Sequence, residues 1–164
     1  MSFYSTKRFG PISTGHRQWK HNGHCSFAHG YGRIVKIIFG GYKLDEKGWV
    51  VDFGALKPIK QFLEQEWDHR LLLAADDPLL EDFLALHEKG GCNINVMHPP
   101  YGPGIELSCA YVFDFADTLV IEGTNGRCWV QSVEIWEHEN NSAIYERHDE
   151  LPHWDGSFEK NMNR

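Results

Sequence analysis

The first 44 residues of this 164-residue chain contain no aspartate or glutamate, although the whole chain carries 23 acidic residues and a net charge of −7. Seven of the chain's 16 lysines and arginines lie in this stretch. The rest of the chain therefore contains 9 basic and all 23 acidic residues, which gives it a net charge of −14. A cationic N-terminal quarter is typical of a local anion site, such as one for a substrate phosphate, or of a segment that docks on an acidic partner subunit. The acidic body excludes a broad nucleic-acid-binding face.

Long apolar runs are also missing. None approaches the roughly 20 residues that a membrane-spanning helix needs, and the N-terminus lacks the apolar segment of a secretory signal. We therefore expect a cytoplasmic protein without membrane association. The 4 cysteines form no CxxC pair, which argues against a disulfide framework and against a four-thiolate zinc site. At least one of them is then available as a reactive thiol.

With 41% hydrophobic residues, the chain can build one ordinary core, which we place over residues 1–147 and follow with a polar tail over 148–164. Alternating and helical hydrophobic patterns predict an α+β domain with an antiparallel sheet and helices on one face. In chain order, the expected elements are a strand over 32–42, a strand over 49–53, a helix over 55–67, a helical insertion over 76–90, a strand over 94–97, a helix over 105–120, a strand over 128–137 and a short extended piece over 143–147.

Four histidines and one cysteine lie within residues 16–29, among glycines and polar residues rather than on an apolar stripe. A catalytic zinc ion commonly takes three protein ligands and leaves a fourth position open. On a strand, His29 and Tyr31 would face one site, with His16 arriving from the preceding strand. Tyr31 is the weakest of the three, because a phenol coordinates poorly unless the metal lowers its pKa. Alternatively, the histidines only satisfy hydrogen bonds on a polar loop.

Three further features carry candidate chemistry. Cys25 lies beside the histidines and the cationic quarter, where a positive field lowers a thiol pKa, so it could act as a base or nucleophile. Asp68 and His69 form either a proton-transfer pair or an ordinary helix terminus. Glu137 shares a strand face with apolar residues, so its carboxylate needs a partner. That partner is either a ligand amidine with parallel N–H donors or an arginine at a subunit interface.

These pieces, in this order, resemble the 6-pyruvoyl tetrahydropterin synthase and 6-carboxytetrahydropterin synthase family. The resemblance runs from about residue 12 to 145, with residues 90–102 as an insertion of unknown role. The matching stretches are STGHRQW, HCSFAHGY, GWVVDFGALK, WDHRLLL and VEIWEHENNSAIY. The family implies a tunnelling fold, in which a four-stranded antiparallel sheet with two helices on one face assembles into an oligomeric barrel. It also implies a homohexamer with active sites between subunits.

The resemblance also implies residue roles. Carried over by position, His16 and His29 match zinc ligands, Cys25 matches the catalytic thiol, Asp68 and His69 match the proton relay, Glu137 matches the carboxylate that binds the pterin, and Glu106 matches an acidic position in the pterin pocket. Tyr31 stands where the third zinc histidine belongs. Either Tyr31 ligates as a phenolate, or His24 or His21 replaces it, or tight metal binding is lost.

The activity that the family implies is a zinc-dependent lyase acting on 7,8-dihydroneopterin triphosphate. We expect the 6-carboxy-5,6,7,8-tetrahydropterin synthase reaction of the queuosine (7-deazaguanine) pathway. The alternatives are the 6-pyruvoyl tetrahydropterin synthase reaction, another pterin conversion, or pterin binding without turnover.

Overall fold

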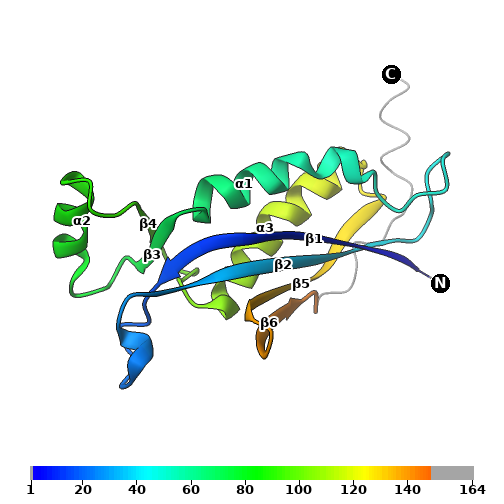
Figure 1. The fold of residues 1–164 in the computed structure, drawn as a ribbon. Helices are drawn as coiled ribbons and strands as arrows, with labels where there is room; N and C mark the ends of the chain where they lie inside the picture. Colours follow the sequence, from blue (N-terminus) through cyan, green and yellow to red (C-terminus); the bar gives the residue numbers. More distant parts are fainter. Residues whose placement is uncertain (1, 149–164) are drawn as a thin grey trace.

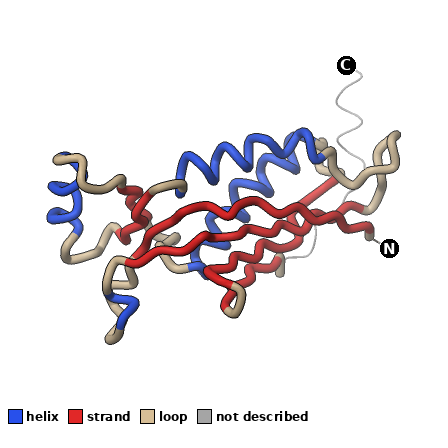
Figure 2. Tube along the Cα trace, in the orientation of Figure 1, coloured by secondary structure: helices blue, strands red, loops and turns tan. Residues whose placement is uncertain are grey.

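The computed structural model describes residues 2–148. The predicted polar tail over 148–164 therefore lies almost wholly outside the described residues. Within them, a six-stranded sheet carries three helices, and Figures 1 and 2 show the sheet as one strongly curled layer. No helix between residues 2 and 148 has the length and apolar character needed to cross a membrane.

The sheet has the strand order β4-β3-β1-β2-β5-β6. Four strands pair antiparallel and form the sheet that the family resemblance implies: β1 (Phe3–His16), β2 (His29–Gly41), β5 (Cys128–His138) and β6 (Asn141–Glu146). Two short strands, β3 (Arg70–Ala74) and β4 (Ile94–Met97), add to the end of β1 in parallel. The sheet is therefore mixed.

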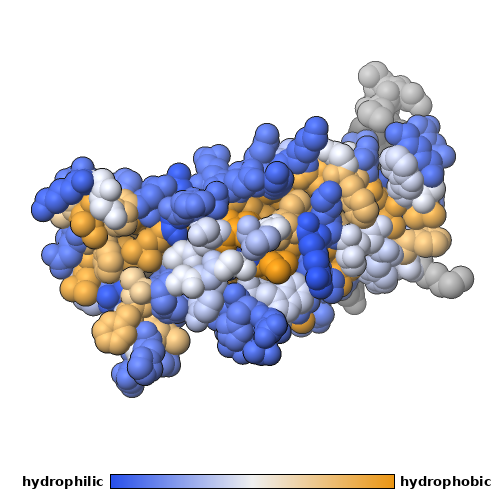
Figure 3. All heavy atoms as spheres, in the orientation of Figure 1, coloured by the Kyte–Doolittle hydropathy of each residue, from blue (hydrophilic) through white to orange (hydrophobic). Residues whose placement is uncertain are grey.

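Two helices cover one face of this sheet (Figure 1). α1 (Lys57–Trp67) packs against β1, and α3 (Ile105–Gly123) packs against β5 and β6. In α1, side chains four residues apart are fully buried: Ile59, Leu63 and Trp67. Figure 3 shows hydrophilic atoms along the outer side of this layer and hydrophobic atoms beneath them. The third helix, α2 (Leu80–Glu88), lies apart at the end of the molecule beyond β3 and β4.

The sequence patterns predicted both covering helices and the strands that became β2, β4, β5 and β6. The predicted strand over 49–53 is wrong. Val50 and Val51 are both buried, at 5% and 6% exposure, so this segment packs consecutive side chains inward without joining a ladder. Asp45 holds the preceding turn, because its carboxylate accepts hydrogen bonds from the backbone N–H groups of Lys47 and Trp49.

Candidate functional site

The pairing of β1 with β2 places His16 directly opposite His29 at the end of the two strands. Residues directly opposite each other share a sheet face, so the two imidazoles meet. Their ring centroids are 4.4 Å apart, and the two Nε2 atoms are 2.9 Å apart. The Nδ1 of His29 lies 2.6 Å from the carbonyl oxygen of Phe27, to which it can donate a hydrogen bond.

Behind His16 lies a buried arginine. Arg33 is fully buried on the face of β2 that also carries His29, and its Nη2 contacts the Nδ1 of His16. The guanidinium also donates to the carbonyl oxygen of Pro103 at 2.7 Å and to Oγ of Ser108 at 3.2 Å, both in or beside α3. Burial lowers the pKa of Arg33 to about 10, which still leaves it charged at neutral pH. Burial, with Arg33 and His29 nearby, lowers the pKa of His16 to about 3, so His16 is neutral.

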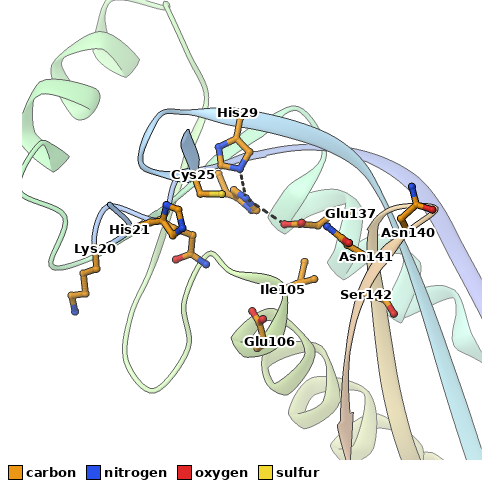
Figure 4. A pocket seen from close by; sticks show the side chains of 12 residues that line it. Lys20, His21, Cys25, His29, Ile105, Glu106, Glu137, Asn140, Asn141 and Ser142 are labelled. Atoms are coloured by element: carbon orange, nitrogen blue, oxygen red, sulfur yellow. Dashed lines mark hydrogen bonds and ion pairs between the residues drawn. The ribbon is translucent and has the colours of Figure 1, made fainter. Parts of the chain in front are cut away.

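A pocket of about 750 Å³ opens in front of the two histidines. Figure 4 shows Cys25 and His29 on one side, Glu137 across from them and Glu106 at the start of α3. Glu137 comes from the end of β5, and its Oε1 lies 3.5 Å from Nε2 of His16. The β5–β6 turn supplies further polar side chains to the wall: Asn140, Asn141 and Ser142. The pocket thus combines two carboxylates, three imidazoles (His16, His21 and His29) and one thiol.

Cys25 belongs to a short 3₁₀ turn, His24–Ser26, in the loop between β1 and β2. This loop is held by local hydrogen bonds, since the backbone N–H of Gln18 donates to the carbonyl oxygen of Cys25 at 2.8 Å. Gln18 also lines the pocket and lies so close to Gly104 that a Cβ there would come within 2.0 Å of its Nε2. A side chain at position 104 would therefore displace the amide of Gln18 from its place in the pocket wall.

The three candidates for a third zinc ligand, Tyr31, His21 and His24, lie in different places relative to the pocket. Tyr31 lies beside the imidazoles, with its ring centroid 5.9 Å from that of His16 and 5.5 Å from that of His29, but it lines a neighbouring hollow. Burial and the nearby carboxylate of Glu137 raise the pKa of Tyr31, so it stays a neutral phenol. His21 lines the pocket, and its Nδ1 accepts from the backbone N–H of Gly23 at 2.8 Å. His24 is exposed and does not line the pocket.

A zinc site of the implied kind does not fit these contacts. Within residues 2–148, no three His, Cys, Asp or Glu side chains gather closely enough to hold a metal ion. His29 has the tautomer that a metal ligand needs, because its Nδ1 donates to a carbonyl and leaves Nε2 available. His16 does not, because its Nδ1 faces a guanidinium, which only donates hydrogen bonds.

Asp68 and His69 lie elsewhere. Their side chains are 41% and 80% exposed and 3.0 Å apart, and Asp68 lines a separate small hollow together with Gly10, Pro11 and Lys60. Neither residue lines the pocket of Cys25 and Glu137. His69 has a left-handed backbone with φ of 55°, which is uncommon for a residue with a side chain and is often found at functional positions. Their role in proton transfer stays a prediction that requires a neighbouring subunit.

Basic residues of the cationic N-terminal quarter form ion pairs with acidic residues of the same chain. Of the seven basic residues in this quarter, Lys20 is the one that lines the pocket within the described structure, and its Nζ lies 2.7 Å from Oδ2 of Asp76. Arg17 forms an ion pair at 2.8 Å with the buried carboxylate of Asp77. Lys20, at the rim of the pocket, is therefore the residue at which we expect an anion to bind.

Sequence reasoning did not identify Arg33 as part of the site. The signal was present, because Arg33 falls at every second position with Val35, Ile37 and Phe39, on the face of β2 that is buried. A lone charged residue in a buried register needs a partner, and here the partners are an imidazole, a carbonyl and a hydroxyl.

Comparisons with known proteins agree with this architecture. The family model described as 6-pyruvoyl tetrahydropterin synthase matches residues 5–148. A probable 6-carboxy-5,6,7,8-tetrahydropterin synthase from Halobacterium salinarum is 42% identical over 72 residues, which cover 44% of this chain and 45% of that protein. A 6-carboxy-5,6,7,8-tetrahydropterin synthase from Aquifex aeolicus is 26% identical over 150 residues, which cover 82% of this chain and 92% of that protein. The match to the Halobacterium protein thus spans less than half of that relative's length.

Solved structures support the fold. An uncharacterized protein from Wolinella succinogenes superposes with a TM-score of 0.76 at 20% identity, covering 90% of this chain and 99% of that one. The 6-pyruvoyl tetrahydropterin synthase of Plasmodium falciparum gives a TM-score of 0.65 at 16% identity, with coverage of 90% and 99%. The tunnelling fold expected from the sequence is therefore confirmed. With a family model spanning nearly all described residues, the chain belongs to the 6-pyruvoyl tetrahydropterin synthase family.

Proposed function

We propose that this chain is a 6-carboxy-5,6,7,8-tetrahydropterin synthase-like lyase that acts on 7,8-dihydroneopterin triphosphate in the cytoplasm. The observation that carries the proposal is the pocket that brings the Cys25 thiol, the His16–His29 pair and the Glu137 carboxylate together in its lining. The relatives named above as 6-carboxy-5,6,7,8-tetrahydropterin synthases support this reaction over the alternatives.

In this proposal, Glu137 binds the amino-pyrimidine edge of the pterin, because a carboxylate can accept two parallel N–H bonds. Its side chain is 16% exposed, so the charge is available to a ligand while largely shielded from water. Glu106, in the first turn of α3, lines the same pocket and completes the acidic side. The bound ring is thereby oriented with its side chain toward Cys25 and the imidazoles, which converts binding into correct positioning of the reacting carbons.

Cys25 moves protons at the substrate side chain as a general base and acid. Asp68 and His69 complete this relay from a neighbouring subunit, since within one chain they lie outside the pocket. The proposal therefore includes a homo-oligomer, a hexamer in the family's manner, with sites between subunits. Lys20 at the pocket rim is positioned to exchange Asp76 for the substrate's triphosphate.

The proposed mechanism uses no zinc ion, although the resemblance implies one. The residues that would hold the ion are His16, His29 and Tyr31, and the contact of His16 with Arg33 does not suit a ligand.

The test is turnover of 7,8-dihydroneopterin triphosphate, followed by chromatography of the pterins. The wild-type protein is expected to consume the substrate, and Cys25→Ala is expected to lose at least about 100-fold in rate, as general acid–base catalysis contributes on this scale. Cys92→Ala is the matched control, because Cys92 is also partly exposed but lies in the insertion. Binding of the pterin without consumption would favour a non-catalytic pterin-binding protein.

A further inference from the structure

The buried pair of Arg33 and His16 is the feature of the site that the family resemblance does not account for. Arg33 has 0% exposure and His16 has 2%. The guanidinium is fixed from three directions, by His16, by the Pro103 carbonyl and by Ser108, and its carbon lies 5.5 Å from the ring centroid of Trp67. A buried guanidinium is tolerated only where hydrogen bonds compensate for its lost hydration, and these contacts provide them.

The partners of Arg33 determine where the proton of His16 lies. A guanidinium has donors and no acceptor, so Nδ1 of His16 must accept, and the ring proton of the neutral imidazole resides on Nε2. Nε2 faces two acceptors, Nε2 of His29 at 2.9 Å and Oε1 of Glu137 at 3.5 Å. Nε2 of His29 is free to accept, because the proton of that ring points to the Phe27 carbonyl. One assignment of protons therefore satisfies the contacts of His16 with Arg33 and His29.

This assignment is opposite to the one that a metal ligand requires. A zinc-binding imidazole offers a lone pair on one nitrogen and donates its other N–H to a carboxylate, carbonyl or water. His16 offers the pocket an N–H instead, with a fixed positive charge behind the ring. The third position carries the Tyr31 phenol in place of an imidazole, and that ring lies 5.8 Å from the ring of His138 in a neighbouring hollow.

We infer that Arg33 replaces the catalytic metal of this site: the buried guanidinium fixes His16 as an N–H donor that stabilises negative charge on a substrate oxygen. The inference rests on the proposed pterin chemistry for the identity of that oxygen, which belongs to the hydroxylated side chain of the substrate. A preorganised donor aimed at developing charge supplies electrostatic stabilisation without a cation ligated in the site. Arg33 is a positioning residue, since it acts through His16.

The first test measures zinc and the His16 tautomer in the wild-type protein. After purification in the presence of zinc sulfate and dialysis, we expect fewer than about 0.1 zinc ions per chain, well short of a stoichiometric site. Long-range ¹H–¹⁵N spectra of the histidine rings, assigned with His16→Gln, are expected to show a proton on Nε2 and none on Nδ1 of His16. Stoichiometric zinc that is lost in His29→Ala, or a proton on Nδ1 of His16, would overturn the inference.

A pair of variants then isolates Arg33. Tyr31→His restores a third imidazole but leaves the guanidinium behind His16, so zinc content is expected to stay low. Tyr31→His combined with Arg33→Gln lets the new side chain accept from Nδ1 of His16, and about one zinc ion per chain is expected. Equal zinc in both variants, or none in a double variant whose circular dichroism shows that it is folded, would contradict the role of Arg33.

These readouts separate the inference from the proposed function. If the protein fails to convert the pterin while zinc content and tautomer are as expected, the proposed function fails and the Arg33–His16 assignment stands. If the protein converts the pterin but loses activity together with a stoichiometric zinc ion on treatment with dipicolinate, the proposed function stands and the inference fails.

Discussion

Glu137 and His16 lie 3.5 Å apart, carboxylate oxygen to Nε2, although they belong to β5 and β1, which are separated by β2 in the sheet. The contact spans the intervening strand at the point where all three strands approach the pocket. With the proton of His16 on Nε2, the imidazole faces the carboxylate as a donor. The carboxylate that we expect to bind the pterin therefore lies beside the histidine that Arg33 contacts.

Glu137→Gln is expected to weaken pterin binding by roughly 10- to 100-fold, the usual cost of losing a hydrogen bond to a charged group. The amide keeps the size of the side chain but cannot accept two parallel N–H bonds. Fluorescence titration with a pterin measures the effect. Glu139→Gln is the control, because Glu139 is exposed two residues further along and does not line the pocket. Equal affinity in the two variants would remove Glu137 from the binding site.

Thiol labelling tests the position of Cys25. Cys25 and Cys92 are partly exposed, whereas Cys109 and Cys128 are buried, so iodoacetamide is expected to modify only the first two in the native protein. A bound pterin should protect Cys25 and leave Cys92 reactive, which peptide mass spectrometry reads directly. Labelling of Cys25 that is indifferent to saturating pterin would place the thiol outside the site.

Cys109 is expected to weaken the fold at alkaline pH. Burial raises its pKa from 9.0 to about 12, so between these values the unfolded chain ionises its thiol and the folded chain does not. This contribution to the free energy of unfolding is complete below pH 9 and is lost as the pH rises toward 12. Cys109→Ser keeps a donor for the Ala143 carbonyl and removes that ionisation.

Urea unfolding of both proteins measures the difference. The stability of the variant relative to the wild type is expected to be constant below pH 9 and to rise above it. A difference that does not vary with pH would show that Cys109 ionises equally in both states.

Mixed assemblies test the shared site. Cys25→Ala and His69→Ala are each expected to be inactive, because each removes one half of the proposed proton relay. Co-expressed with different tags and purified through both, they should regain activity at about one quarter of the interfaces, where an intact Cys25 meets an intact His69. No recovery in a mixed oligomer would place both residues in the same chain's site or remove His69 from the mechanism.

Much of this site was predictable from local patterns. Helical spacing located α1 and α3, and alternation located β2 and β5, since each buries one continuous face. The predicted approach of His16 to His29 followed from the side-chain direction on paired strands. The sequence did not specify their register, which the pairing of Thr14 with Tyr31 and of His16 with His29 determines.

The failures have physical causes as well. β3 is a five-residue strand whose hydrogen bonds go to distant segments, so nothing in its own sequence marks its partners. Val50 and Val51 lie in a short apolar stretch that is typical of a strand. Their side chains are instead buried by tertiary packing, and the segment joins no ladder. Asp68 lines a separate hollow of the described chain, so the proposed part of Asp68 and His69 in the relay depends on a neighbouring subunit, which local sequence patterns do not place.

The measurement that tests the account most directly is the stoichiometry of acetaldehyde release from 7,8-dihydroneopterin triphosphate. We predict that each substrate, with one water, yields one acetaldehyde, one triphosphate and one 6-carboxytetrahydropterin, and that Cys25→Ala yields none of these products. Triphosphate release without acetaldehyde, or a substrate that remains unchanged in the presence of the folded wild-type oligomer, would contradict the account.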